Sequence, residues 1–121
     1  MKPLSKTKLQ EFLERFEYFK GSEFRSLEVI DATTLKITYA LQDGAKEFDW
    51  ITLSLEFSGV SDARILEDTK MSFTSLDDGV SLLLENNMFA FCVGECATLS
   101  CIREATYYII AQNIKYEEGE F

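Results

Sequence analysis

Runs in which apolar and polar residues alternate follow one another from Leu27 almost to the end of the chain. In the clearest run, every second residue from Leu35 to Leu41 is large and apolar, and the residues between them are Lys36, Thr38 and Ala40. A period of two is typical of β-strands that bury one face and expose the other. We therefore expect the four apolar side chains of this run to be buried, and Lys36 and Thr38 to be exposed.

Short turn signals separate these runs and predict how the strands are connected. The segments Asp31–Thr33 and Gln42–Glu47 are too short for a parallel crossover, so the three strands that they join should form an antiparallel meander. Asp77-Asp78-Gly79 is typical of a hairpin turn, and Val60–Leu66 fits either a bent strand continuation or a short helical turn. Further strands, in sequential order, are expected at 70–76, 80–84, 88–93, 96–103 and 107–116, followed by a frayed acidic tail at 117–121.

The segment from Thr7 to Phe19 has the spacing of an amphipathic helix. Ser5 or Thr7 can cap its start, and Lys20 followed by Gly21 is typical of a helix end. An isolated helix of this length is marginal in water, so we expect its apolar stripe to pack on the sheet. That stripe consists of Leu9, Phe12, Leu13, Phe16 and Phe19.

Together these patterns predict an α+β fold in one domain spanning residues 1–121. An N-terminal helix should pack on a curled, mainly antiparallel sheet of seven to eight strands. The pattern leaves open whether that sheet forms a roll, a barrel-like structure or two layers. With 46% hydrophobic residues and ten phenylalanines, the chain has enough apolar surface to fill one core.

The charge of the chain narrows its partners. Twelve Lys and Arg residues against 21 Asp and Glu give a net charge of −9, which repels nucleic acid and anionic membranes. A basic protein partner or self-association remains compatible with this balance. The chain has no apolar run of the roughly 20 residues that a membrane span needs, and its basic start at Lys2 is not followed by an apolar segment. We expect a cytoplasmic protein.

Cys92, Cys96 and Cys101 lie close together in the sequence, on predicted strands. A structural zinc site wants four Cys or His ligands, and the chain has three cysteines and no histidine. Cys96 and Cys101 are separated by an odd offset, so on a regular strand their side chains point to opposite faces and cannot converge without a bulge. We therefore expect three free structural thiols and no bound metal, and we leave open whether the cysteines have a redox role.

No motif in the sequence indicates catalysis or cofactor binding. The missing histidine removes the commonest general base, and all six glycines are isolated. Adjacent carboxylates fall where solvated turns or tails are expected, and a pair from distant positions, such as Glu56 and Glu85, cannot be inferred from spacing. We therefore assign no catalytic, cofactor or metal residue. The adjacent pairs are Glu67-Asp68, Asp77-Asp78 and Glu117-Glu118.

Three classes of function remain, and the sequence favours the first. The chain is expected to be a non-enzymatic protein-binding or interaction module whose acidic surface engages a basic partner. The first alternative is a carrier that holds a small apolar ligand in a cavity inside the curled sheet. An enzyme using carboxylates or a cysteine is the least supported. Tyr107, Tyr108 and Tyr116 fit either an amphipathic contact surface or, as we prefer, ordinary sheet packing.

Overall fold

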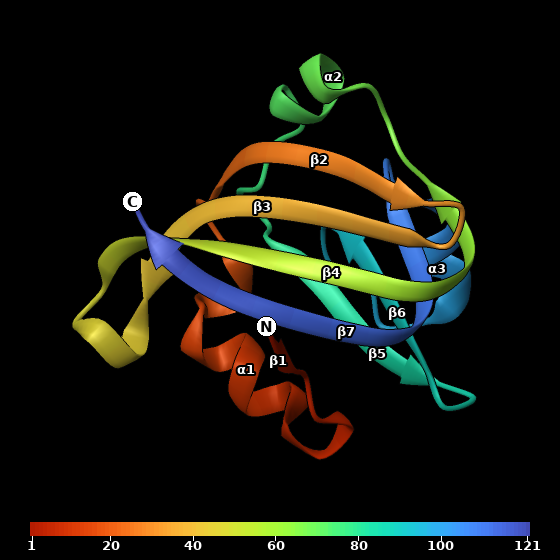
Figure 1. The fold of residues 1–121 in the computed structure, drawn as a ribbon, viewed down its shortest axis with the longest axis horizontal. Coiled ribbons are helices and arrows are strands. Elements are labelled where there is room, and N and C mark those ends of the chain that lie inside the picture. The colour runs from red at the N-terminus through yellow and green to blue at the C-terminus, as the bar shows by residue number, and fades with distance from the viewer.

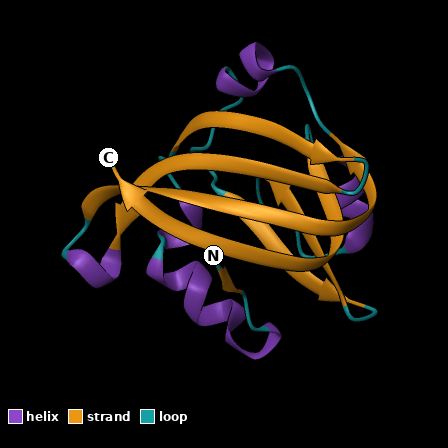
Figure 2. Ribbon diagram, in the orientation of Figure 1, coloured by secondary structure: helices purple, strands orange, loops and turns teal.

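Residues 1–121 are described by a computed structural model, which gives every side chain except that of Asp68. The chain forms mostly strands, with short helices at the periphery (Figures 1 and 2). The strands are β1 (Lys2–Pro3), β2 (Glu23–Asp31), β3 (Thr34–Asp43), β4 (Asp49–Arg64), β5 (Val80–Glu85), β6 (Met88–Val93) and β7 (Tyr108–Glu120). The helices are α1 (Leu9–Arg15), α2 (Asp68–Ser72) and α3 (Leu99–Glu104), with 3-10 turns η1 (Lys6–Lys8), η2 (Glu17–Phe19) and η3 (Gly44–Lys46).

The strands form one antiparallel sheet of seven, in the order β2-β3-β4-β7-β6-β5, with β1 paired to β7. The sheet is strongly curled but not closed, so the α+β prediction is confirmed and a closed barrel is ruled out (Figure 1). Sequential strand order was wrong at one point, because β4 pairs with β7 and not with β5. The segment 65–79, which contains α2, carries the chain from β4 to the opposite edge of the sheet.

The predicted register of β3 is confirmed on its concave side. Leu35, Ile37, Tyr39 and Leu41 are all buried. Lys36 and Thr38 are half-buried, not exposed as expected, because β3 has a neighbour on each side. Lys36 lies opposite Glu28 on β2 and Glu56 on β4, and Thr38 Oγ1 lies 2.8 Å from Ser54 Oγ. The convex face is therefore a packed polar surface with paired charges.

β4 is the longest strand, and a bulge bends it. The register with β7 shifts between Val60 and Asp62, directly after Gly59, which has a φ of +64° that glycine adopts without a steric penalty. The ambiguous region after Gly59 therefore continues as strand to Arg64. The bend allows the first part of β4 to pair with β3 while the whole strand follows β7, and it contributes to the curl of the sheet.

The N-terminal aromatic residues fill the concave face of the sheet, as predicted. The Phe12 ring lies 5.1 Å from Phe16 and 5.0 Å from Tyr116 of β7, measured between centroids. The helix itself is shorter than expected, because α1 ends at Arg15 and the chain turns through η2 with positive φ at residues 17–19. This turn places Phe19 5.4 Å from the Tyr39 ring, a contact that a continuous helix could not make as it left the sheet.

Two predicted strands are helices in the structure. The strand predicted at 70–76 from alternating apolar residues is wrong, because this segment contains the end of α2. Met71 is fully buried in α2, whereas Phe73, two residues later, is 89% exposed. Residues two apart lie on one face of a strand but on different faces of a helix. Asp77-Asp78-Gly79 does form a turn, closed by Gly79 N–H donating to the Leu76 carbonyl at 2.9 Å, but it does not join two strands.

The predicted strand at 96–103 is instead a loop followed by α3. The Thr98 hydroxyl accepts a hydrogen bond from the Cys101 N–H at 3.2 Å, which caps the start of α3. α3 covers the outer face of β6 and β7, where Ile102 is buried in a second small core with Ala90, Cys92, Tyr108 and Ile110. The tail prediction was also wrong, since β7 continues to Glu120 and pairs with Ile51.

No helix in the part of the chain that the structure describes has both the length and the apolar character needed to cross a membrane.

Candidate functional site

A buried charge cluster joins α1, β3 and β7. Arg15 donates from Nε to Asp43 Oδ1 at 2.9 Å and from Nη2 to Asp43 Oδ2 at 2.7 Å. Nη2 also lies 2.7 Å from Glu118 Oε1, which forms a second ion pair with the same guanidinium. The side chain of Asp43 is fully buried, so its charge depends on Arg15 for compensation.

The same carboxylate shapes the turn between β3 and β4. Asp43 Oδ1 accepts a hydrogen bond from the Ala45 N–H at 2.9 Å, and the Asp43 carbonyl accepts one from Phe48 N–H at 2.9 Å. The hydrogen bonds from Arg15 are the main reason that the pKa of Asp43 is lowered, although burial opposes the shift. Asp43 is therefore ionised, and its carboxylate is bound by Arg15 and by the backbone of η3, so it fixes the position of that turn.

Near this anchor lies an exposed pair of aromatic residues, Trp50 and Phe121, which we call the aromatic patch. These side chains are 39% and 65% exposed. The rings of Trp50 and Phe121 lie 5.6 Å apart, and the guanidinium of Arg25 lies 5.0 Å from the Phe121 centroid. Arg25 therefore makes a cation–π contact with the Phe121 ring.

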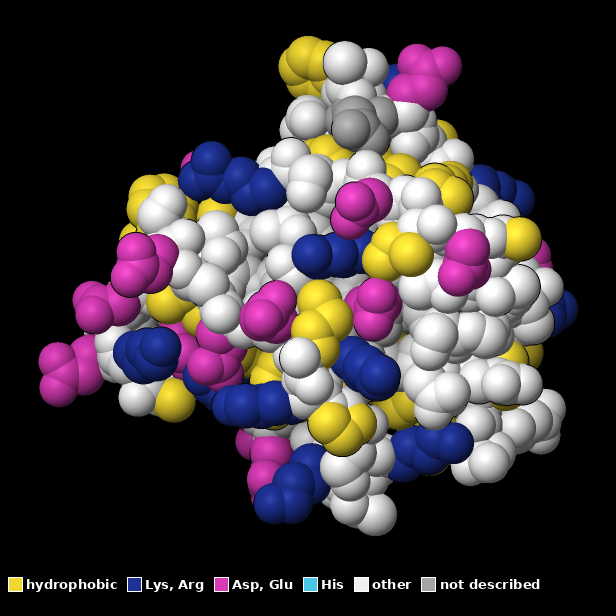
Figure 3. Space-filling view, viewed as in Figure 1, with side chains coloured by type: hydrophobic (Ala, Val, Ile, Leu, Met, Phe, Trp, Pro, Cys, Tyr) yellow, Lys and Arg dark blue, Asp and Glu magenta, His cyan; other side chains and the backbone are white. Residues whose placement is uncertain are grey.

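Acidic residues lie beside the aromatic patch. A surface cavity of about 380 Å³ between the ends of β4 and β7 is lined by Trp50 and Phe121 together with Asp49, Glu118 and Glu120, although the Glu118 carboxylate is already paired with Arg15. Acidic side chains gather over the η3 turn and the neighbouring end of β7 (Figure 3). Lys46 is the one cation that lines this cavity among the described residues. The cavity therefore combines apolar rings with the carboxylates of Asp49 and Glu120.

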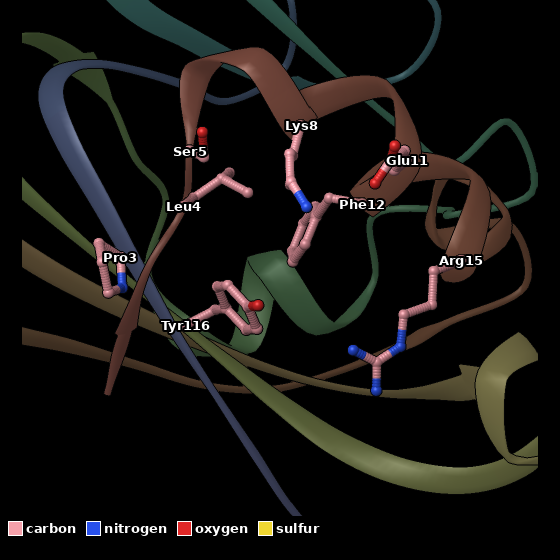
Figure 4. A pocket seen from close by; sticks show the side chains of 8 residues that line it. All are labelled: Pro3, Leu4, Ser5, Lys8, Glu11, Phe12, Arg15 and Tyr116. Atoms are coloured by element: carbon pink, nitrogen blue, oxygen red, sulfur yellow. The ribbon is translucent and has the colours of Figure 1, made fainter.

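A second hollow, beside α1, has fewer charged side chains that are free to bind a ligand. It holds about 200 Å³, and Figure 4 shows Lys8 and Phe12 on one side and Tyr116 on the other. Arg15 lines it too, but the Arg15 guanidinium points toward the sheet, where Asp43 and Glu118 already bind it. This hollow therefore presents no free binding group of its own beyond Lys8 and the nearby Glu11.

The expectation of three free thiols is wrong for two of them. Cys96 and Cys101 form a disulfide, with their Cα atoms 5.5 Å apart. The parity argument failed because Cys96 lies in a loop and Cys101 in α3, so neither lies on a regular strand. Cys92 is free and buried, and that burial raises the pKa of its thiol. The described residues contain no group of three or more metal-ligating side chains.

The carboxylates named from the sequence do not converge. Asp77 and Asp78 are exposed at their turn, whereas Glu118 is drawn into the Arg15 cluster. Of the pair Glu67-Asp68, the side chain of Asp68 lies outside the described residues. Glu56 and Glu85 lie on β4 and β5, which are separated in the sheet by β7 and β6.

The three tyrosines are part of the packing. Tyr107 and Tyr108 are buried, and Tyr116 packs against Phe12. The Tyr107 hydroxyl lies 2.9 Å from that of Tyr39 inside the sheet, and burial raises the pKa of both phenols. The preference for sheet packing over a contact surface is therefore confirmed for these side chains.

Comparison with known proteins gives no match: no family model, no curated protein and no solved structure is similar to this chain. A function is therefore inferred from the sequence and the geometry of this chain.

Sequence reasoning missed the aromatic patch. Trp50 alternates with buried residues along β4 and so falls on the polar side of that strand, while Phe121 falls in the segment that the sequence predicts to be a frayed tail. One feature of the sequence points to the patch: Trp50 is a large aromatic residue at a strand position where the alternation predicts a polar, exposed side chain, and it follows a turn that contains Glu47 and Asp49. Their proximity depends on the β4–β7 pairing, which joins distant parts of the sequence.

Proposed function

We propose that this protein is a non-enzymatic interaction module that binds a basic segment of a partner protein at the aromatic patch. The observation that carries the proposal is the pairing of exposed Trp50 and Phe121 rings with Asp49 and Glu120 around one cavity. Aromatic residues are enriched at protein interfaces, and their faces attract Lys and Arg side chains. The net charge of −9 would speed the encounter with a basic partner.

The rigid support under the patch favours binding over an accidental exposure of rings. Asp43 fixes η3 and Arg15 fixes Asp43, so the turn that precedes Trp50 is already held in place. A preorganised surface loses less conformational entropy on binding than a flexible one. Self-association through this surface is the weaker alternative, because it would bring two acidic patches together.

The interior weighs against the carrier alternative. Phe57 and Phe91 lie 5.1 Å apart inside the curl, and Tyr39 and Tyr107 are hydrogen-bonded there. The pockets described above are surface hollows at the ends and flanks of the sheet. The carboxylates of Asp43 and Glu118 do come together, but both are bound to Arg15, so they give little support to the enzyme alternative.

The cytoplasmic location belongs to the same proposal. Buried Cys92 is a free thiol in any compartment, so it does not discriminate between locations. The Cys96–Cys101 disulfide does, because in the reducing cytoplasm such a bond would be transient or redox-sensing. Measuring the thiol state of the protein trapped in intact cells tests this location.

The single tryptophan makes the binding proposal directly testable, because Trp50 fluorescence reports on the patch alone. A labelled arginine-rich peptide is titrated into the protein, with a glutamate-rich peptide as the negative probe. We expect the arginine-rich peptide to change Trp50 emission with an affinity that falls as salt is added, and the acidic peptide to have no effect.

The variants Glu120→Lys and Glu85→Lys change the net charge equally, but only Glu120 lines the cavity of the patch. We expect Glu120→Lys to weaken peptide binding by about tenfold and Glu85→Lys by far less, since rim charges distant from a contact act only through the screened overall field. Equal losses in the two variants, or unchanged Trp50 emission with the arginine-rich peptide, would contradict the proposal.

A further inference from the structure

The largest hollow described lies at the opposite flank of the sheet, away from the aromatic patch. It holds about 540 Å³ and lies between η2, the start of the edge strand β5 and the loop before α3. It shares no lining residue with the cavity at the patch. Among the described residues that line it, the one sulfur atom belongs to Cys96 of the disulfide. We call this hollow the disulfide cleft.

The two cysteines of the disulfide lie differently with respect to the cleft. Both are half-buried, but Cys96 lines the cleft, whereas Cys101 belongs to α3 and its Sγ lies 3.7 Å from the Glu95 carbonyl oxygen. A molecule in the cleft would therefore lie beside Cys96, which lines it, and not beside Cys101, which does not. Once it has left and taken up a proton, the Cys101 thiol can donate a hydrogen bond to that carbonyl.

The backbone around both cysteines is held by bonds other than the disulfide. The Ser81 hydroxyl accepts a hydrogen bond from the Cys96 N–H at 2.8 Å and donates one to the Gly94 carbonyl at 2.7 Å. The Thr98 hydroxyl accepts one from the Cys101 N–H. Opening the disulfide would therefore leave these anchors in place, so the two sulfurs stay near each other and the bond can form again.

Charged groups of both signs face the cleft. Lys20 Nζ lies 4.0 Å from Glu95 Oε1, in an ion pair that is well exposed to solvent, and Asp78 is a second carboxylate on the rim. Exposed pairs of this kind contribute little to stability, so they can exchange partners at small cost. One ammonium and two carboxylates complement a ligand that itself carries carboxylates and an ammonium group.

We propose that the disulfide cleft is a thiol-exchange site for a small zwitterionic thiol of the glutathione class. The thiolate of the ligand attacks Cys96 Sγ, the Cys96–Cys101 bond breaks, and Cys101 leaves as a thiolate that takes up the proton released when the ligand ionised. The product is a mixed disulfide on Cys96 and a free thiol on Cys101. A second ligand thiol attacks the ligand sulfur of that mixed disulfide, which gives a free Cys96 thiol and the oxidised, dimeric ligand. The reverse sequence, starting from the dimeric ligand, restores the bond.

The first experiment asks which sulfur exchanges. The variants Cys101→Ser and Cys96→Ser, each of which keeps one cysteine of the pair, are incubated with oxidised glutathione, and the modified peptide is followed by mass spectrometry. We expect Cys96 in the first variant to be modified at least about tenfold faster than Cys101 in the second, because access decides which sulfur reacts. Equal rates, or faster modification of Cys101, would overturn the proposal.

The wild-type protein provides a check that does not depend on these variants folding. Its disulfide is opened with reduced glutathione, and the mixed disulfide is trapped by rapid alkylation. Glutathione on Cys96 with an alkyl group on Cys101 is the expected product. Glutathione on Cys101, or on Cys92, contradicts the proposed direction of attack.

The second experiment asks whether the cleft recognises the charges of the thiol. Lys20→Glu removes the cation of the cleft, and Lys115→Glu makes the same charge change on β7, on the convex face. We expect Lys20→Glu to slow exchange with glutathione several-fold more than Lys115→Glu, and both to react alike with uncharged 2-mercaptoethanol. Identical rates of the two variants with glutathione would overturn the assignment of a zwitterionic ligand, whatever the outcome at the aromatic patch.

Discussion

Arg15 binds the buried carboxylate of Asp43 with two hydrogen bonds, across 28 positions of sequence. The bond fixes the end of α1 to the end of β3, and through Asp43 it also fixes the η3 turn. Bidentate pairs of this kind are geometrically specific, because both N–H groups of the guanidinium edge must meet both carboxylate oxygens.

Replacing Arg15 by Ala is expected to lower the free energy of unfolding by about 3 kcal/mol, because the Asp43 charge would remain buried without a partner. Arg15→Lys should recover part of the loss, since an ammonium supplies the charge but not the paired geometry. Urea unfolding of the three proteins measures both effects. A loss below about 0.5 kcal/mol for Arg15→Ala, the range of ordinary surface substitutions, would show that the pair is not formed in solution.

The stability that Asp43 contributes should disappear in acid. Its folded-state pKa lies below the unfolded value of about 3.9, so its contribution is fully present above about pH 4 and is lost as the pH falls through the folded pKa. The free energy of unfolding of the wild type should therefore exceed that of Asp43→Asn near neutral pH and approach it in acid. A difference that stays constant as the pH falls below that range would contradict the assignment of a lowered pKa.

The aromatic stripe of the N-terminus should carry much of the core. Phe16→Ala is expected to cost on the order of 3 kcal/mol, because the Phe16 ring is buried between Phe12 and Phe19. Phe73→Ala removes the same side chain from an exposed position on α2, so it should cost less than about 0.5 kcal/mol. Chemical denaturation compares the two variants, and similar losses would mean that the stripe does not face the sheet.

The two sides of β3 should respond differently to a new carboxylate. Ile37→Asp should prevent folding, because Ile37 is fully buried in the concave core. Lys36→Asp should fold, but it places an acid directly between Glu28 and Glu56, and each like-charge pair costs roughly 0.2–1 kcal/mol. Melting temperatures of the two variants test this prediction. If the two variants melt at the same temperature, β3 does not bury one face and leave the other accessible to solvent.

Gly79 and Gly21 form a matched pair for a test of close packing. Both have positive φ, but a Cβ added at Gly79 would overlap the Tyr18 carbonyl oxygen, whereas one at Gly21 would meet nothing within 4 Å. Gly21→Ala should cost roughly 1–2 kcal/mol, the strain of a left-handed alanine, and Gly79→Ala clearly more. Equal losses measured by urea unfolding would indicate that η2 does not pack on the start of β5.

Local periodicity predicted much of the fold, and long-range pairing explains most of what it missed. The burial of Leu35 and Ile37 followed from a period of two, which each strand carries in its own sequence. α3 was missed because Thr98, its cap, lies inside a run that also fits a strand, and a six-residue helix has too few turns to show its period. The insertion of β7 between β4 and β6 depends on contacts that no local pattern records.

The candidate sites were harder to predict than the fold, for the same reason. Trp50 and Phe121 are 71 positions apart in the sequence and meet only because β4 pairs with the end of β7. The Cys96–Cys101 bond depends on the loop before α3, which a strand prediction excludes. A site built from neighbours in space but not in sequence becomes visible only when the register is known.

The position of β7 in the sheet has a consequence for how the chain folds. β2–β4 form one meander and β5–β6 form a hairpin, and the two are joined by strand pairing only through β7, the last of the described strands. During synthesis the meander and the hairpin would therefore emerge unpaired with each other, and the sheet would be completed in one late step. Folds dominated by such non-local pairings reach their native state in milliseconds to seconds rather than microseconds. The interval before β7 docks is when this chain is most exposed to aggregation.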